Sequence, residues 1–572
     1  MTFKGFSVNL LLEKRYSGGG GGGAAAASKE KEMNWTGIPK SRVAGALVLV
    51  LTTFALYSNT LLNGFVYDDV HQILKNPWIT DPGYLPVIFT SSLGEFLPGV
   101  ASGTYRPMIH VVYMAEYALF GLEPWGYHLV NVILQSGVVV LVFLVASRLI
   151  EKDSGIYPFA AALYFALHPA HTEVVAWVSA MQDLAFTILV LCAFYVYAGM
   201  ERPGAKGTLF AGLLFFIALF FKETALVFLP LVFIHDLALR DSSAPVKNWR
   251  AYLAFIALAA LYFAARAYAV RAALPGKRWF DLTDYQYLIN VFPLVPLYFQ
   301  KLLFPVNLSA YYYIEPIGSL AEARGFLSLA FIVILGYGIY RAFRYDRLVF
   351  FALAWVLVAI LPTLYLPGIG KSFFAERYLF FPSVGFCIFA VLLVGRFLEG
   401  REFAGAGGGG RIITVTLVVV AAVLLTFQTV KRNSVWRDGF SLWSDTVRKS
   451  PGAALPHYNL GVEYARMGLG DLAIEEFKRS TVLDPTYDNA FYNLAVMYDR
   501  RGEFDLAVKY YGETLRLNPQ SADAHLNLGV IYRKQGQIAE AEAEFQMALR
   551  IDSSLEAAGV YLDEIKAMER RK

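Results

Sequence analysis

The chain contains little charge and almost no cysteine. Asp, Glu, Lys and Arg make up 17% of its 572 residues and hydrophobic residues 56%, whereas a soluble globular chain is about a quarter charged. The two cysteines, Cys192 and Cys387, both lie inside apolar runs, which gives no basis for a disulfide framework or a zinc site. The net charge of +4 is too small to indicate a nucleic-acid surface. These scarcities exclude a disulfide-rich secreted domain and a nucleic-acid-binding protein.

Long apolar runs dominate the first three quarters of the chain. Most are roughly 17 to 25 residues long, enough for a helix to cross a bilayer. Every second run is followed by Lys or Arg, which places the N-terminus in the cytoplasm because basic residues concentrate on that side. We therefore predict a multi-pass protein of the cytoplasmic membrane. Eleven spans are expected, at residues 43–62, 127–149, 156–172, 183–200, 207–221, 224–239, 251–268, 325–340, 348–366, 379–398 and 412–430.

Three further segments complete this membrane part. Residues 107–120 are too short to cross and predict a helix lying on the membrane. Residues 287–304 predict a re-entrant or interfacial helix, because a full crossing would put the basic residues after 340 on the outer side. Residues 1–40, rich in Gly and Ala, predict a disordered cytoplasmic tail. Met33 is an alternative start, so translation of residues 1–32 stays open.

Two adjacent carboxylates, Asp68 and Asp69, follow the first span on the predicted outer side. Charged groups beside a membrane are costly, so they are functional candidates by default. A carboxylate placed against a hydroxyl can take its proton during nucleophilic attack. The alternative is a structural role in a capped loop or a surface pair. Of the two, Asp68 is favoured as the base, because neighbouring side chains in a loop point apart and only one can face the acceptor.

Three cations, Arg106, Lys222 and Arg377, stand at outer-side span boundaries and are candidates for binding a donor phosphate. The alternative is a structural ion pair, Lys222 with Glu223 or Arg377 with Glu376.

Further polar residues are expected to line a cavity on the same side. His168, His171 and Glu173 have a spacing that could ligate a metal, but one short cluster is weak evidence, so no metal ligands are assigned and a divalent metal is left open. Asp183 and Glu376 are the other cavity candidates.

From residue 432 the chain becomes polar and repeats with a period of 34 residues. Small and aromatic residues and a closing proline recur at fixed positions in 454–487, 488–521 and 522–555, which is the tetratricopeptide signature. A half repeat precedes them and a capping helix follows. Asn459, Asn493 and Asn527 coincide under this shift. Their amides can hold a peptide backbone by paired hydrogen bonds, or they can serve helix packing alone.

Several motifs together resemble one family. Tyr67-Asp68-Asp69, Tyr105-Arg106-Pro107, the segment from His168 to Glu173 and the segment from Ala375 to Ser383 occur in this order. They resemble the transmembrane and tetratricopeptide-repeat O-mannosyltransferase family, which is similar to the C-type glycosyltransferases (GT-C). The resemblance implies catalysis by the acidic pair, a polyprenyl-phosphate mannose donor, and Ser or Thr acceptors on secretory proteins.

Two departures from this family stand out. Met181-Gln182-Asp183 replaces the common Arg-Ala-Asp, which removes one cation, and the repeat array is short beside those of animal members. Both indicate a bacterial relative, whose donor would be linked to undecaprenyl phosphate.

We predict an all-α protein with about 11 spans, a GT-C-like membrane domain at 41–431 and a tetratricopeptide solenoid at 432–572. Its predicted activity is transfer of mannose or another hexose from a lipid-linked sugar phosphate to Ser or Thr of a protein held by the repeats. One alternative is a membrane glycosyltransferase that modifies a glycan or lipid or transfers a whole oligosaccharide. Another is a membrane-anchored repeat scaffold without enzymatic activity.

Overall fold

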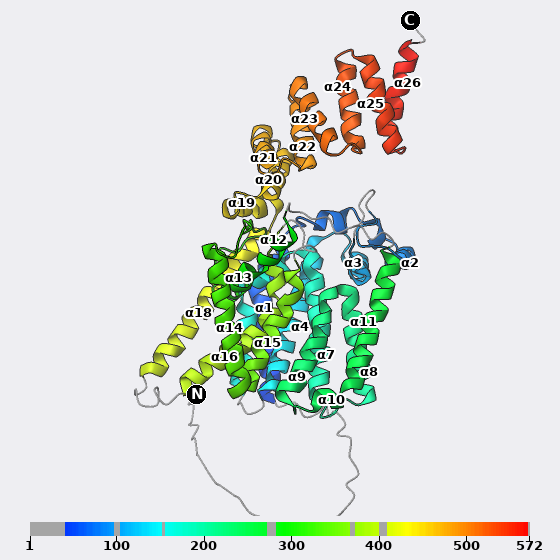
Figure 1. Cartoon of the computed structure of the whole chain (residues 1–572). Coiled ribbons are helices and arrows are strands. Elements are labelled where there is room, and N and C mark those ends of the chain that lie inside the picture. The colour runs from blue at the N-terminus through cyan, green and yellow to red at the C-terminus, as the bar shows by residue number, and fades with distance from the viewer. Residues whose placement is uncertain are drawn as a thin grey trace, which may run out of the picture. The chain divides into compact units, whose positions relative to one another are not determined.

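A computed structural model describes residues 40–96, 103–150, 155–270, 282–365, 372–399 and 409–569. Within these ranges every regular element is a helix (Figure 1). The chain divides into two compact units, Met1–Ala44 and Gly45–Lys572, and all contacts described below lie within the second. The predicted disordered tail lies outside the described residues, apart from Lys40, where the first helix begins.

Seven helical segments are long and apolar enough to cross a membrane by length and composition. At 1.5 Å per residue, about 20 residues cover a hydrocarbon core of about 30 Å. The chain is therefore a multi-pass membrane protein. The seven segments are Ser41–Leu62, Pro124–Leu149, Val178–Ala198, Trp249–Ala269, Ala323–Tyr345, Arg347–Leu364 and Val415–Trp436.

These seven candidate segments coincide with seven of the eleven predicted spans. They overlap the helices α1 (Lys40–Tyr57), α4 (Pro124–Leu149), α7 (Met181–Gly199), α11 (Trp249–Ala269), α14 (Ala323–Tyr345), α15 (Arg347–Ile360) and α18 (Gly409–Asn433). The other four predicted spans coincide with helices that are not among these seven segments. Three of the four count only as shorter apolar helices: Ile156–Leu167, Ala205–Phe221 and Pro382–Phe397. The four helices are α5 (Ile156–Leu167), α8 (Ala205–Phe221), α9 (Phe228–Leu239) and α16 (Pro382–Glu399). Crossing by these four stays a prediction.

The two segments predicted to lie along the membrane are helical but short. Helix α3 (Pro107–Phe120) coincides with the predicted 107–120. The stretch 287–304 forms two helices, α12 (Asp284–Ile289) and α13 (Val291–Leu303), which are separated at Asn290. Neither is long enough to span a bilayer alone.

The membrane helices pack into one bundle. Helix α7 lies against α4 and α8, α8 lies against α11, and α15 lies against α9 and α16 (Figure 1). Small residues such as Ala161, Ala162 and Ala193 are fully buried in its core beside large aromatic side chains such as Phe165 and Phe194. This mixture lets helices approach closely where little hydrophobic driving force separates them from lipid.

The polar C-terminal part consists of helix pairs. One helix, α19 (Gly439–Lys449), precedes three hairpins, and α26 (Glu556–Glu569) follows them. Each hairpin turns at a glycine with φ near +75°, Gly468, Gly502 or Gly536, a conformation that favours glycine. The three hairpins are α20 (Ala454–Arg466) with α21 (Gly470–Leu483), α22 (Asp488–Arg500) with α23 (Phe504–Leu517), and α24 (Ala522–Lys534) with α25 (Ile538–Ile551).

Candidate functional site

The loop after the first span has an unusual backbone. Tyr67 adopts φ +56°, the left-handed region that bulky residues rarely occupy. Its ring packs 5.4 Å from the ring of Trp177 and 5.1 Å from that of Trp443, measured between centroids. Strained backbone persists only where the surroundings hold it, and it gathers at functional sites. The turn at Tyr67 fixes the directions in which Asp68 and Asp69 leave the chain.

The carboxylate of Asp69 holds this loop in place through hydrogen bonds. Its side chain is fully buried. One carboxylate oxygen accepts hydrogen bonds from the Ser179 amide at 2.8 Å and the Ser179 hydroxyl at 2.5 Å, and the other accepts from the Val66 amide at 3.0 Å. Burial raises the pKa of Asp69 to about 7, although these hydrogen bonds oppose the shift. Asp69 therefore ties the loop to the start of the segment that contains α7.

Asp68 differs from its neighbour in having a free carboxylate. The side chain is half-buried, and among the described residues its carboxylate makes no hydrogen bond or ion pair. Burial raises the pKa of Asp68 to about 6, while the charge of Arg377 acts in the opposite direction. A carboxylate that is reachable, unpartnered and has a pKa of about 6 is suited to general-base chemistry near neutral pH.

The segment that enters the repeats also frames the acidic loop. The Asn63 side chain donates to the Asn433 carbonyl at 3.3 Å, and the Gly64 amide donates to the Arg437 carbonyl at 2.8 Å. Together with Trp443, these contacts come from residues 433–443. The acidic loop is thus held from both the membrane bundle and the beginning of the polar part.

Arg377 is paired with Glu173. Its Nη1 donates to Glu173 Oε1 at 2.6 Å, and its backbone amide donates to Glu173 Oε2 at 3.0 Å. The guanidinium also lies 5.5 Å from the centre of the Trp177 ring and 5.0 Å from that of Tyr378. Because Trp177 packs on Tyr67 as well, one aromatic side chain connects the cation to the acidic loop.

The other two predicted phosphate-binding cations form their own pairs. Lys222 Nζ lies 2.5 Å from Asp183, and both side chains are buried. Arg106 binds both oxygens of Glu223, at 2.6 and 3.0 Å, and donates to the Gln182 amide oxygen at 2.9 Å. Gln182 is the middle residue of the Met181-Gln182-Asp183 departure, so this variant motif supplies a partner for Arg106.

The two pairings suggested from sequence neighbours are wrong. Lys222 does not pair with Glu223, and Arg377 does not pair with Glu376. Lys222 has extended backbone at the end of α8, where consecutive side chains point to opposite sides. Lys222 and Glu223 consequently reach different partners.

The three cations nevertheless belong to one electrostatic cluster. Burial lowers the pKa of Lys222, Asp183 opposes that shift, and the charges of Arg106 and Arg377 add to it. Arg377 in turn acts on Asp68. Arg377 thus acts on both Asp68 and Lys222, and each of the three cations is paired with a carboxylate.

Glu376 points away from Arg377 into a second network. It is fully buried, accepts a hydrogen bond from the Tyr312 hydroxyl at 2.8 Å, and lies 3.3 Å from Arg432. Arg432 also contacts Asp445 of α19 at 3.1 Å. Sequence reasoning missed Arg432, although a basic residue at the outer end of the last predicted span was a usable signal, since it departs from the charge rule.

His168 and His171 are fully buried. His168 Nε2 lies 2.9 Å from the Leu302 carbonyl oxygen, and His171 Nε2 lies 2.8 Å from the Ser383 hydroxyl. Their rings are 5.2 Å apart. Within the described ranges, no three His, Cys, Asp or Glu side chains come together in a way that could hold a metal. The two histidines connect the loop after α5 to α13 and α16.

The asparagines of the repeats lie on the first helix of each hairpin. Asn493 donates to the Tyr458 hydroxyl at 3.1 Å, and Asn527 donates to the Tyr492 hydroxyl at 3.0 Å. Asn459 instead donates to the Leu455 carbonyl in its own helix at 3.0 Å. In the first two cases the bond joins one repeat to the next and fixes the orientation of the amide.

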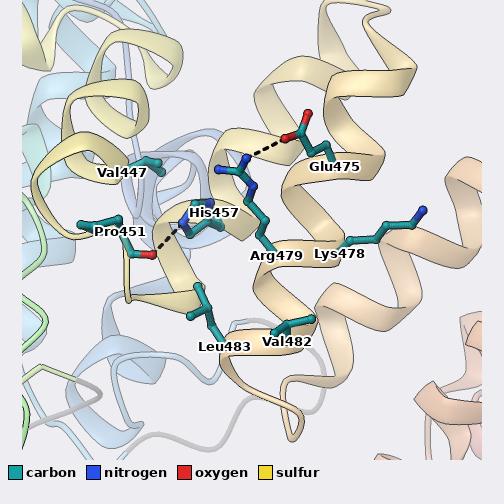
Figure 2. Close-up of a pocket in the computed structure, with 8 residues that line it drawn as sticks. All are labelled: Val447, Pro451, His457, Glu475, Lys478, Arg479, Val482 and Leu483. Atoms are coloured by element: carbon teal, nitrogen blue, oxygen red, sulfur yellow. Dashed lines mark hydrogen bonds and ion pairs between the residues drawn. The ribbon is translucent and has the colours of Figure 1, made fainter.

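A pocket of about 400 Å³ lies in the first repeat, and none of the predicted site residues lines it (Figure 2). His457 points at the Pro451 carbonyl oxygen, 3.0 Å from Nε2, while its Nδ1 lies 2.5 Å from Glu476. His525 makes the matching contacts with Pro519 and Glu544 in the third repeat. This recurrence identifies the histidine as a connection within the repeat.

Comparison with known proteins supports both halves of the chain. The tetratricopeptide repeat family model matches residues 458–519 and 492–556. Protein O-mannosyl-transferase F38B6.6 of Caenorhabditis elegans is 27% identical over 460 residues, covering 78% of this chain and 64% of the relative. Protein O-mannosyl-transferase TMTC1 of Homo sapiens is 26% identical over 516 residues, covering 78% and 56%. The chain thus spans less than two thirds of the length of these relatives.

A solved structure is also similar in part. The crystal structure of ArnT from Cupriavidus metallidurans bound to undecaprenyl phosphate shares 15% identity, with a TM-score of 0.39, covering 84% of this chain and 81% of ArnT. The apolar helices and the match of the repeat family model make the chain a multi-pass membrane protein with tetratricopeptide repeats. Its distant homologues are protein O-mannosyltransferases, which are glycosyltransferases.

Proposed function

We propose that the chain is a membrane protein O-glycosyltransferase. It would move mannose or another hexose from a polyprenyl-phosphate carrier to a Ser or Thr hydroxyl on the outer side of the membrane. The observation that carries this proposal is the unpartnered carboxylate of Asp68, in a loop whose Tyr67 ring packs on Trp177, the ring that the Arg377 guanidinium also approaches. The names of the homologous enzymes and the resemblance of the motifs support the same reaction class.

In the proposed reaction Asp68 is the general base. It takes the proton of the acceptor hydroxyl as the hydroxyl oxygen forms a bond to the anomeric carbon of the sugar. The bond between that carbon and the phosphate oxygen breaks, and the polyprenyl phosphate leaves with the electron pair. Attack opposite the leaving group inverts the anomeric carbon. Asp69 would position the loop, because all of its observed hydrogen bonds hold backbone or Ser179.

The cation cluster would receive the donor phosphate. Arg377 is the first candidate, because 26% of its side chain is exposed, against 16% for Arg106 and 8% for Lys222. Its forked guanidinium suits a phosphate. Its charge also lowers the pKa of Asp68. Lys222 and Arg106 would contribute mainly through their charge, which grows in importance as negative charge develops on the leaving phosphate.

The repeats would hold the acceptor segment through Asn459, Asn493 and Asn527. A side-chain amide can pair with both a donor and an acceptor of a peptide backbone, without reading its sequence. His168, His171, Glu173, Asp183 and Glu376 would shape the surroundings of the site. A divalent metal, the bacterial origin and the undecaprenyl carrier stay predictions.

The proposal is tested by assaying transfer from polyprenyl-phosphate mannose to Ser- and Thr-containing peptides with purified protein. Asp68→Asn should lower kcat by about a thousandfold or more, since it removes the base while keeping its size. Its thermal stability should equal that of the wild type, because the carboxylate it replaces has no partner among the described residues. The Asp68→Ala, Asp69→Ala double variant should be inactive. Full activity of Asp68→Asn would refute the proposed role.

A further inference from the structure

Three kinds of side chain form columns along the repeats. Under the 34-residue step, Asn459, Asn493 and Asn527 coincide, as do Val462, Val496 and Val530. Arg466, Arg500 and Lys534 form a third set. Within each first helix the members stand at i, i+3 and i+7, which places them on one helical face. Each repeat therefore presents an amide, a valine and a cation side by side.

A hollow of about 390 Å³ brings these columns together between the first and second repeats. Helix α20 contributes a valine and a cation, helix α22 contributes an asparagine, a valine and a cation, and α21 contributes an aromatic ring. These lining residues are Val462, Arg466, Phe477, Asn493, Val496 and Arg500. One hollow thus contains hydrogen-bonding, apolar and positively charged surface.

The polar groups of this hollow have unused capacity. Asn493 donates one amide hydrogen to the Tyr458 hydroxyl. This bond fixes the orientation of the amide and leaves its carbonyl oxygen and its second hydrogen for a ligand. Arg500 has no ion pair or hydrogen bond with the residues that the structure describes. Among the described residues Arg466 pairs with Glu463, three residues earlier on the same helix, and 58% of the Arg466 side chain stays exposed.

The charge of the hollow contrasts with that of the repeats around it. Over residues 454–555, Asp and Glu outnumber Lys and Arg. The charged residues lining the hollow are nevertheless both arginines. A basic site within an acidic array favours a negatively charged ligand by complementarity, which acts on specificity and on the rate of association.

We infer that this hollow binds an extended acceptor peptide through an Asp or Glu side chain. The carboxylate would lie between Arg466 and Arg500, since guanidinium groups bind carboxylates with two parallel hydrogen bonds. Asn493 would hold the adjacent peptide backbone, and an apolar side chain would contact Phe477 and the valines. This inference rests on the proposed function, because the bound peptide is an acceptor only if the protein transfers a sugar to it. It adds that acidic segments are the preferred acceptors.

The test measures peptide binding to the full-length protein in detergent by fluorescence anisotropy. The probes are a fluorescein-labelled ten-residue peptide of Thr, Val and Gly with two central Glu residues, and the same peptide with Gln. The variant is Arg500→Ala. The matched control is Arg501→Ala, which removes the same charge one residue later from a side chain paired with Asp471 and Glu503.

We expect the wild type to bind the Glu peptide about tenfold more tightly than the Gln peptide, in keeping with a charge-assisted contact. Arg500→Ala should remove this preference, and Arg501→Ala should keep it. Equal affinity for both peptides, or an equal effect of the two variants, would overturn the inference, as would binding of neither peptide.

Binding and transfer are separate measurements. A Glu preference without any sugar transfer by the wild type would keep the binding site and refute the proposed reaction. Transfer to both peptides at equal efficiency, with no preference in binding, would support the proposed reaction and refute the binding site for acidic peptides.

Discussion

The Asp69 carboxylate receives two hydrogen bonds from Ser179, one from its amide at 2.8 Å and one from its hydroxyl at 2.5 Å. These residues are 110 positions apart in the chain, so the contact joins the acidic loop to the second candidate span after it. Both oxygens of Asp69 thus accept hydrogen bonds from the protein, so the neighbouring Asp68 is the candidate for the reaction. The following predictions examine this division and the charges around it.

Ser179→Ala should weaken the loop without removing the base. The variant loses the hydroxyl bond to Asp69 and keeps the amide bond, and a hydrogen bond to a charged group contributes about 1.5–3 kcal/mol. We expect a lower thermal midpoint and a lower kcat, with little change in KM for the donor. Ser147→Ala is the control, because the Ser147 hydroxyl has no hydrogen-bond partner among the described residues. An equal effect of both variants would contradict the role of Ser179.

Activity should rise with pH through the range set by the acidic pair. Burial raises the pKa of Asp68 to about 6 and that of Asp69 to about 7. A general base works only when ionised, so kcat/KM should fall as pH decreases through about 7 to 6 and reach a plateau above. The apparent values belong to the pair, because adjacent carboxylates titrate together.

A variant gives this pH profile a specific check. Arg377 lowers the pKa of Asp68, so Arg377→Met should move the acidic limb of kcat/KM to higher pH, besides reducing the rate. If the acidic limb of this variant, measured between about pH 5 and 9, is unchanged, then the pKa seen in the rate profile does not belong to Asp68.

Breaking the buried Lys222–Asp183 pair should be strongly destabilising. Asp183→Asn leaves a buried ammonium without its counter-ion, which costs about 3–5 kcal/mol. The Lys222→Met, Asp183→Leu double variant replaces both charges by apolar side chains and should recover most of the stability. We expect transfer to stay low in the double variant, because the proposed phosphate cation is missing. Full activity there would assign the pair a purely structural role.

The ring of Tyr67 should matter more than its hydroxyl. Tyr67→Phe keeps the contacts with Trp177 and Trp443 and should behave like the wild type. Tyr67→Gly relieves the left-handed backbone, which costs an ordinary residue about 1–2 kcal/mol, but it frees the loop. We expect Tyr67→Gly to remain folded and to lose most of kcat. Comparable activity of the two variants would show that the aromatic contacts do not position Asp68.

Features that depend on local pattern were predictable from the sequence. Run length indicated the long helices, and the 34-residue step indicated the helix hairpins with their turning glycines. The acidic pair and the three cations were found because charge is rare in this part of the chain. Each of these signals can be read from a residue and its near neighbours.

The partners of those charges were not predictable in the same way. Glu173 and Arg377 are 204 positions apart, and only the packed bundle brings them together. Adjacency in sequence pointed to Glu223 and Glu376 as partners, and it failed because neighbouring side chains leave the backbone in different directions. Ser179, Gln182 and Tyr312 carry no charge, so nothing in a single sequence distinguishes them from other polar residues.

The hold of residues 433–443 on the acidic loop has a consequence for building hybrid proteins. Lys449 and Ser450 make a second attachment, to the segment after α13, by donating to the carbonyls of Leu308 and Tyr311, at 2.6 and 2.7 Å. Helices α19 and α20 therefore belong with the acidic loop, because Leu460 of α20 packs in one apolar cluster with Val66 and Trp443. The later hairpins pack mainly on one another. A fusion point beyond the first repeat (454–487) would leave these contacts intact, so repeat arrays of other lengths could be exchanged there.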